Sequence, residues 1–298
     1  GTSVGGAQEA TPDGTASGPS LEVVAAGLTS PRGFVWAADG TLFVAEAGTG
    51  GPSPGTPVAP PPIGPFMGGP TASIVRIQDG CPVALVEGLP STIDAIGGVL
   101  GAEDLAILGG ELYASVDGGG EAHGNADQPS GVYRILANGT AELVADLSAW
   151  VRANPVENVP PDFDPDAAGM LWVDDPNSSQ ILSVTPDGTV ARIADLSAGH
   201  PVTTGLALAP QGGVYVGTLT AVPFPDGAAR VLHVAPDGAT TEVWTGLTAV
   251  TDVAVGPDGT LYAAEISTGN TEAPPFIVPG SGRIVRQAGP DAAEPVAT

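Results

Sequence analysis

The sequence contains no lysine, and its eight basic residues are all arginine. Set against 33 acidic residues, these give the 298-residue chain a net charge of −25 at pH 7. So acidic a surface repels nucleic-acid phosphates and anionic lipid headgroups, which argues against nucleic acid and membrane surfaces as partners. Proteins, sugars, apolar small molecules and cations remain open as partners.

Cysteine and long apolar segments are scarce as well. Cys81 is the only cysteine, so the chain forms no internal disulfide. No apolar run reaches the 18 residues that a transmembrane helix needs. Residues 1–20 are rich in Gly, Ser and Thr, which predicts a flexible leader of the kind that remains after export. We therefore expect an exported bacterial protein, secreted to the extracellular space or the periplasm.

One sequence unit occurs five times. Each copy has an inner strand of small residues, a glycine turn, a strand with an aromatic residue, a third strand and an outer strand. The aromatic markers of the five copies are Phe43, Tyr113, Trp172, Tyr215 and Tyr262. Period-two alternation between glycine turns predicts an all-β fold, here a β-propeller of four-stranded blades that occupies residues 21–298 as one domain.

The two ends of this repeat series offer the same strand. Residues 21–28 (LEVVAAGL) match an outer strand, and residues 294–298 begin another. Propellers usually close when a terminal strand completes the blade begun at the other end. We therefore expect a six-bladed pattern with an incomplete last blade, and a closed five-bladed ring is the alternative. In the third repeat the inner strand is expected near residues 161–165.

The repeats differ in length in only two kinds of connection, from the second to the third strand and from the outer strand to the next inner strand. Both kinds emerge on one face of a propeller, which we call the long-loop face. Because variable loops on a rigid scaffold usually carry function, we expect the ligand or partner to bind there. The long segments are residues 47–71, 89–102, 117–130, 147–160 and 266–281.

Two segments resemble the bacterial ScyD/ScyE family, exported propellers with NHL-like repeats. The first is PRGFVWAADGTLFVAEAGTGG at 31–51, and the second spans 201–267 and includes FPDGAAR at 224–230. The resemblance implies six blades and export, and it brings no established reaction or catalytic residues. The chain departs from the family pattern at GAED (101–104), where Pro-His-Asp is more usual.

Histidine is the commonest acid–base catalyst, and the chain has three. His233 stands in a repeat position, so we interpret it as structural. His123 and His200 lie on the long-loop face, where each is either an exposed loop residue or a ligand contact. Virginiamycin-inactivating lyases share this general scaffold and depend on histidine. We take His200 as a ligand-face residue and His123, with Glu103 and Asp104, as weak catalytic candidates.

Carboxylates recur at one position, directly after the aromatic strand: Glu46, Asp175 and Glu265. Their repetition favours carboxylates that accept backbone N–H groups in the loops. The alternative is a ring of acids that, with Asn177, Asn270 and Asp104, binds calcium as in lactonase-type propellers. Asp162, Asp164 and Asp166 also alternate as in a calcium loop, but lack the glycine and distal Glu of an EF-hand. Solvated acids are our interpretation there, and a structural calcium is the alternative.

Residues 51–70 are too long and too apolar for a simple connector. Three prolines at 60–62 precede Ile63, Phe66 and Met67. A proline-stiffened loop with large apolar side chains suits docking onto a partner, and packing on the propeller's own face is the alternative. We expect a binding or scaffolding protein that acts through its long-loop face, within an extracellular assembly; the alternative is a calcium-assisted hydrolase or lyase at the channel mouth.

Overall fold

Glycine turns fold this chain back on itself every few residues, and the result is almost entirely strand. The computed structural model describes residues 22–57, 63–160, 164 and 172–297. At the tips of the hairpins, Gly40 and Gly139 have φ angles of 86° and 84°, a region that glycine enters without steric cost. The strands form five separate antiparallel sheets in chain order.

The first two sheets come from residues 31–146. The first runs β1 (Pro31–Trp36), β2 (Leu42–Glu46), β4 (Met67–Gln78) and β5 (Cys81–Ile93), with the short β3 (Ser53–Pro54) paired to β4 and β6 (Val99–Leu100) paired to β5. The second comprises β7 (Ala102–Leu108), β8 (Glu111–Val116), β9 (Gly131–Ile135) and β10 (Ala141–Asp146).

The remaining three sheets repeat the same order. The third contains β11 (Trp172–Asp175), β12 (Gln180–Val184) and β13 (Val190–Asp195). The fourth contains β14 (Thr203–Leu208), β15 (Val214–Thr218), β16 (Ala229–Val234) and β17 (Thr240–Leu247). The fifth contains β18 (Val250–Val255), β19 (Leu261–Glu265), β20 (Arg283–Gly289) and β21 (Ala292–Ala297).

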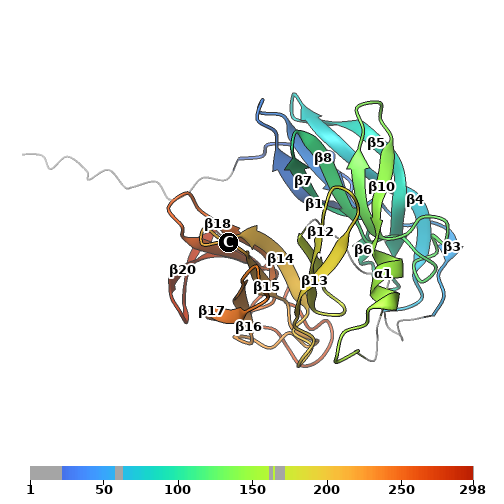
Figure 1. The fold of residues 1–298 in the computed structure, drawn as a ribbon. Coiled ribbons are helices and arrows are strands. Elements are labelled where there is room, and N and C mark those ends of the chain that lie inside the picture. Colours follow the sequence, from blue (N-terminus) through green and yellow to red (C-terminus); the bar gives the residue numbers. More distant parts are fainter. Residues whose placement is uncertain (1–21, 58–62, 161–163, 165–171, 298) are drawn as a thin grey trace, which may run out of the picture.

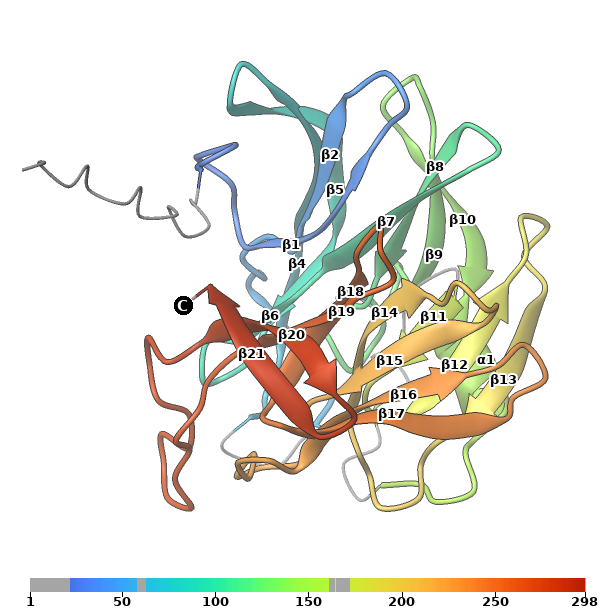
Figure 2. The same cartoon turned by 90° about the vertical axis from the view of Figure 1, so that its left-hand side faces the viewer.

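The five sheets follow one another around a common centre, from blue through green and yellow to red, as the blades of a β-propeller (Figures 1 and 2). The predicted fold class is confirmed. Four of the predicted aromatic markers lie on the second strand of their sheets, and Trp172 begins β11, the first described strand of the third sheet. The inner strand expected near residues 161–165 lies outside the described residues, apart from Asp164.

The core consists of apolar layers between neighbouring sheets. Separate clusters join the first sheet to the second, the second to the third, the third to the fourth and the fourth to the fifth. One position of the third strand shows the pattern. In each sheet this position is paired with the residue that follows the aromatic marker by two places. In the first four sheets its occupants are fully buried: Ile74, Val132, Ile181 and Val231.

The fifth sheet breaks this pattern. Its residue at the same position, Ile284, is 43% exposed. On β1 of the first sheet, Phe34 is 62% exposed, whereas the matching Leu105 and Val253 are 5% and 4% exposed. Among the described residues, no apolar cluster joins the fifth sheet to the first. Each of these two sheets therefore packs against a single neighbouring sheet.

The structure corrects three details of the sequence analysis. Residues 22–28 form no strand, so the predicted outer strand there is wrong in its described part; Leu28 instead packs on the first sheet, against Leu42, Val44 and Val75. The expected loop at 47–71 contains β3 and the start of β4. The connection after β10 holds a helix, α1 (Leu147–Ala153), whose first turn is capped by Asp146.

Of the described helices, none is long and apolar enough to cross a membrane.

Candidate functional site

A large groove opens on the long-loop face, between the third and fourth sheets. It is a groove of about 650 Å³, within the range typical of small-molecule sites. One wall is the connection from β13 to β14, and the other is the connection from β15 to β16 with the adjoining parts of β16 and β17. Its residues include Ala198, His200, Pro201, Thr218, Thr220, Val222, Arg230, Leu232 and Glu242.

Two carboxylates and one guanidinium line this groove. Asp195 accepts the backbone N–H groups of Ser197 and Glu157, at 3.0 and 2.8 Å, and these hydrogen bonds help to lower its pKa despite partial burial. Arg230 donates one N–H, through Nη1, to Glu242 of the neighbouring strand. Asp195 is therefore satisfied within the chain, whereas the guanidinium of Arg230 keeps further donors.

Two more polar groups of the groove lack partners. Among the described residues, the imidazole of His200 makes no hydrogen bond, and the Oγ1 atom of Thr220 is buried without one. Buried polar atoms are nearly always paired, so an unpaired one at a groove wall is suited to a hydrogen bond with a water molecule or a ligand. The structure thus places His200, which the sequence analysis assigned to the ligand face, in the wall of this groove.

One backbone feature of the groove is structural. Val202 has a φ of 51°, a strained value for a β-branched residue. Ser30 and Ala249 hold the same position before the first and fifth inner strands, with φ values of 49° and 44°. In all three the carbonyl accepts the N–H of the residue after the second strand. This left-handed turn therefore belongs to the repeat and is no sign of function.

The recurring carboxylates of the sequence analysis each tie a loop to its own sheet. Glu46 accepts the N–H of Thr29 at 2.7 Å and the hydroxyl of Ser73 at 2.6 Å. Glu265 accepts the N–H of Thr248 at 2.5 Å and the guanidinium Nε–H of Arg283. Both carboxylates are buried. These bonds match the structural interpretation, with one backbone donor and one donor from the third strand.

Asp175 follows the same rule in the third sheet. It accepts the N–H of Ser178 at 3.0 Å and the amide of Gln180 at 2.6 Å. Burial raises the pKa of Asp175 to about 6, although these hydrogen bonds oppose the rise. The neighbouring Asp174 accepts the hydroxyl of Thr203, and burial raises its pKa well above the usual value. The three repeated carboxylates thus serve separate sheets, and their oxygens are committed to internal donors.

The fourth sheet lacks this carboxylate. Its second strand ends in Thr218, and the loop position of Thr29 and Thr248 is Pro201, which has no N–H to offer. The third-strand donor is nevertheless present as Arg230, whose own N–H reaches Thr218 Oγ1 at 2.9 Å. The groove opens where acceptor and backbone donor are both missing. Sequence reasoning missed Arg230, although this departure from the repeat was a readable signal.

The inner strands carry a second group of acids. Glu103 lies 3.5 Å from Arg32 and accepts the N–H of Gly101, which Asp117 also accepts. Burial, then the charge of Glu103, raises the pKa of Asp117 well above its usual value. Asp117 was not anticipated from the sequence. The two carboxylates, as a close pair, favour the retention of a proton between them.

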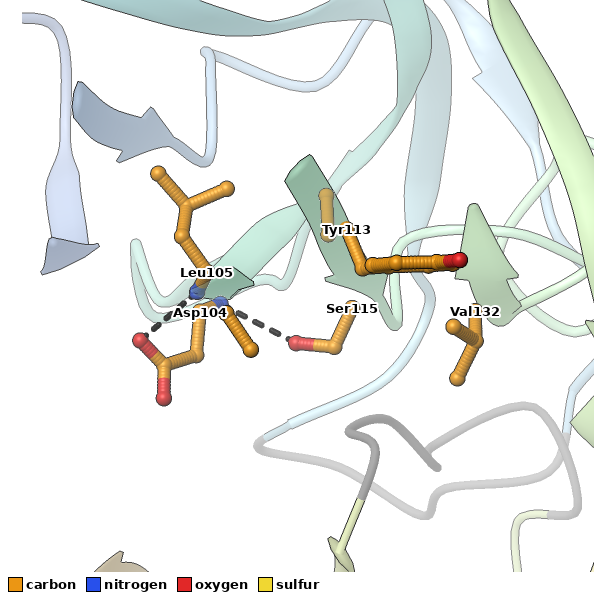
Figure 3. Close-up of a pocket in the computed structure, with 7 residues that line it drawn as sticks. Asp104, Leu105, Tyr113, Ser115 and Val132 are labelled. Carbon is orange, nitrogen blue, oxygen red and sulfur yellow. Dashed lines mark hydrogen bonds between the residues drawn. The ribbon is translucent and has the colours of Figure 1, made fainter. Parts of the chain in front are cut away.

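Asp104 lies further along the same inner strand. Burial raises its pKa to about 7, the charges of Asp252 and Glu103 add to the rise, and the N–H of Leu105 opposes it. Figure 3 shows Asp104 accepting that N–H while its own N–H bonds to Ser115. The cavity beside it measures about 10 Å³, space for one water molecule and not for a substrate.

His123 is fully buried. Its Nε2 lies 2.9 Å from Asp164 Oδ2, its Nδ1 has no hydrogen-bond partner among the described residues, and the ring of Phe66 meets it edge-on at 4.8 Å. The N–H of Asp164 bonds to Asn177 at 2.8 Å. The structure therefore places His123 apart from Glu103, Asp104 and the groove, in the packing between a loop of the second sheet and the third.

The remaining predicted site residues are dispersed. Phe66 is buried, Met67 begins β4, and Ile63 is 37% exposed, so only Ile63 of the three is presented to a partner in this structure. Asn270 donates to the carbonyl of Phe224 at 3.0 Å. His233 bonds to the carbonyl of Gly212, consistent with a structural role. Asp162 and Asp166 lie outside the described residues.

The described residues contain no group of three or more His, Cys, Asp or Glu side chains that could hold a metal ion. The repeated carboxylates are separated by their own sheets and bound to internal donors. The candidate acids therefore do not combine into a calcium site in the described part of the chain.

No model of a known protein family matches the sequence, and no curated protein matches it. Among solved structures, the PQQ-bound aldose sugar dehydrogenase of Streptomyces coelicolor aligns over 97% of this chain and 86% of its own, with 15% identity and a TM-score of 0.54. Virginiamycin B lyase from Staphylococcus aureus covers 90% and 69%, with 14% identity and a TM-score of 0.47. Regucalcin from Agrobacterium tumefaciens covers 91% and 94%, with 10% identity and a TM-score of 0.45. At such identities the likeness concerns the propeller fold alone.

Proposed function

We propose that the protein is a binding protein whose ligand occupies the groove between the third and fourth sheets. One observation carries the proposal: a groove of about 650 Å³ on the long-loop face gathers polar groups that have no partner among the described residues, including the imidazole of His200. A shared fold leaves function open, because propellers support many activities. The site, rather than the fold, therefore supports the assignment.

The experiment fills the groove without touching its charged groups. Ala198 is an exposed groove residue, and Ala137 is an exposed residue of the β9–β10 turn outside the groove. A small-molecule library is screened by saturation-transfer NMR against the unmodified chain, A198W and A137W. We expect hits that bind the unmodified chain and A137W and are lost in A198W. Hits that survive in A198W would contradict the groove as the ligand site.

A calcium-assisted hydrolase or lyase is the second candidate, and the buried His123–Asp164 contact is the observation that favours it. The acids at the channel mouth fit the ion poorly, since Glu46, Asp175 and Glu265 already accept internal donors. Titration with calcium, followed by thermal unfolding, tests this candidate. A saturable rise in melting temperature would support a calcium site, and an unchanged melting curve would count against it.

Export, membership of the ScyD/ScyE family and a scaffolding contact through Ile63 belong to the same proposal. They are supported by the acidic composition, by the sequence resemblance and by the exposure of Ile63. Ile63→Asp is expected to leave groove binding unchanged and to weaken any assembly that uses this loop, which native mass spectrometry of the protein purified from its source would show.

A further inference from the structure

The fourth sheet has no acidic residue at the end of its second strand, whereas the neighbouring fifth sheet has one. Its second strand ends in Thr218, where the fifth sheet has Glu265. The third strands begin alike, with Arg230 beside Thr218 and Arg283 beside Glu265. In the fifth sheet the guanidinium of Arg283 is held by the buried carboxylate of Glu265. In the fourth sheet the equivalent arginine has no such partner.

The arginine in the fourth sheet turns to a different carboxylate. Arg230 bonds through Nη1 to Glu242 on β17, and both side chains are close to half exposed. In the described residues it makes no other side-chain hydrogen bond. A guanidinium carries five N–H donors in a planar fork, so Arg230 retains donors that match a second carboxylate.

The second sheet shows that an arginine of this protein can hold two carboxylates. Arg134 bonds to Glu142 at 2.7 Å through Nη2 and to Glu111 at 3.4 Å through Nη1. Arg230 stands at a different strand position and bonds to one acid, Glu242, with no second acid bonded to it among the described residues. The glutamate beside Arg230 therefore does not preclude a bound carboxylate.

The rest of the groove around Arg230 suits an apolar chain. Leu196, Leu232, Pro201 and Val222 line it, and its volume of about 650 Å³ exceeds what a single carboxylate needs. His200 supplies one more group that can donate a hydrogen bond. Asp195, the other acid of the lining, is already bound to two backbone N–H groups, and the charge of Arg192 also acts on it.

We propose that the groove binds small carboxylates with an apolar tail, and that the ligand carboxylate takes at Arg230 the role that Glu265 has at Arg283. This inference rests on the proposed function, because it names the ligand class of the same groove. The charge of the chain as a whole repels anions. The preference for a carboxylate therefore comes from local charge-assisted hydrogen bonds between the ligand and the guanidinium of Arg230.

The test compares three six-carbon probes, hexanoate, hexylammonium and 1-hexanol, by isothermal titration calorimetry. We expect the chain to bind hexanoate at least about tenfold more tightly than either other probe, because charge-assisted hydrogen bonds are the strong ones. Arg230→Gln should abolish this preference. Arg286→Gln is the matched control, since Arg286 also pairs with a strand glutamate, Glu294, but lies in the fifth sheet away from the groove.

A second variant restores the missing acid. Thr218→Glu places a carboxylate beside Arg230 as in the fifth sheet, and should weaken hexanoate binding by a larger factor than 1-hexanol binding. Equal binding of all three probes, unchanged by R230Q, would overturn the carboxylate assignment and leave the groove as a ligand site. Hexanoate binding that A198W does not weaken would place the ligand elsewhere and overturn both proposals. Failure of hexanoate to bind the unmodified chain at millimolar concentration would overturn the carboxylate assignment alone.

Discussion

Ile74 and Ile284 occupy the same position of the third strand in the first and fifth sheets, yet one is fully buried and the other is 43% exposed. The strand pairing around them is the same, so the difference comes from what lies beyond each sheet. Ile74 packs against the second sheet, within a cluster that includes Leu105 and Ala114. Ile284 faces no equivalent layer.

Truncation of these two isoleucines should therefore have unequal effects. Ile74→Ala removes a fully buried side chain from a packed layer and should lower the free energy of unfolding by about 2–5 kcal/mol. Ile284→Ala should cost less than about 1 kcal/mol, since solvent already reaches the side chain. Urea unfolding of both variants measures the difference. Equal losses would mean that Ile284 is covered in solution.

The inner strands should tolerate no added methyl group at Gly33. A Cβ there would lie 1.9 Å from Asp104 Oδ1 and 2.7 Å from Asp104 Cα, so the backbone of the second sheet would have to move. Gly33→Ala should destabilise the fold by about 1–3 kcal/mol through this overpacking. Gly289→Ala is the control, because its Cβ would meet nothing closer than 3.5 Å. Thermal unfolding that ranks the two variants alike would contradict the close approach of β1 and β7.

Asp104 should make stability depend on pH. Its folded pKa of about 7 lies above the usual 3.8, so between these values the folded state holds a proton that the unfolded state has lost. The contribution of Asp104 to stability is therefore lost as the pH rises from about 4 to about 7. One pKa unit corresponds to about 1.4 kcal/mol, so the loss is on the order of a few kcal/mol.

Asp104→Asn removes this titration while an amide oxygen still accepts the N–H of Leu105. The variant should gain stability relative to the unmodified chain as the pH rises from 4.5 to 8, measured by urea unfolding at each pH. Asp187→Asn is the control, since hydrogen bonds from Thr185 and Thr189 lower the pKa of this exposed carboxyl. Its effect should stay constant over that range. A constant difference for D104N as well would show that Asp104 is ionised throughout.

The two arginine–glutamate pairs of the fourth and fifth sheets should differ in strength. Glu265 is buried and serves both Arg283 and the N–H of Thr248, so Glu265→Gln should cost about 1–3 kcal/mol. Glu242→Gln breaks only the solvent-exposed pair with Arg230 and should cost less than about 1 kcal/mol. Urea unfolding at low and high salt checks this, and E242Q alone should lose its effect in high salt.

The sequence predicted the blades well because their signals are local. Alternation, aromatic markers such as Tyr113 and turns such as Asp39-Gly40 act within a few residues, so strands and hairpins can be read from one repeat. The extension of β4 to Met67 could not be predicted from one repeat, since it depends on pairing with Ile93 of β5. Helix α1 was missed because its short segment has a weak periodic pattern.

The candidate site was predicted in part. The long-loop face and His200 followed from the variable connections, but the sequence analysis did not single out Arg230. The unpaired donors of Arg230 stand out only when this residue is compared with Arg283, which bonds to Glu265. The sequence analysis interpreted Glu265 only as one of three repeated carboxylates. The absence of that acid at Thr218, with proline at 201, was visible in the sequence but gained meaning only from the hydrogen bonds of the other sheets.

In the part of the chain that the structure describes, the apolar layers link the five sheets as a line with two ends, since none of these layers joins the fifth sheet to the first. In a linear array, each unit is held by its immediate neighbours, and the terminal units open most easily. Amide hydrogen exchange should therefore be fastest in the first and fifth sheets and slower in the three sheets between them. The groove lies between two of these inner sheets, so thermal fraying of the first or fifth sheet can proceed without opening the binding site.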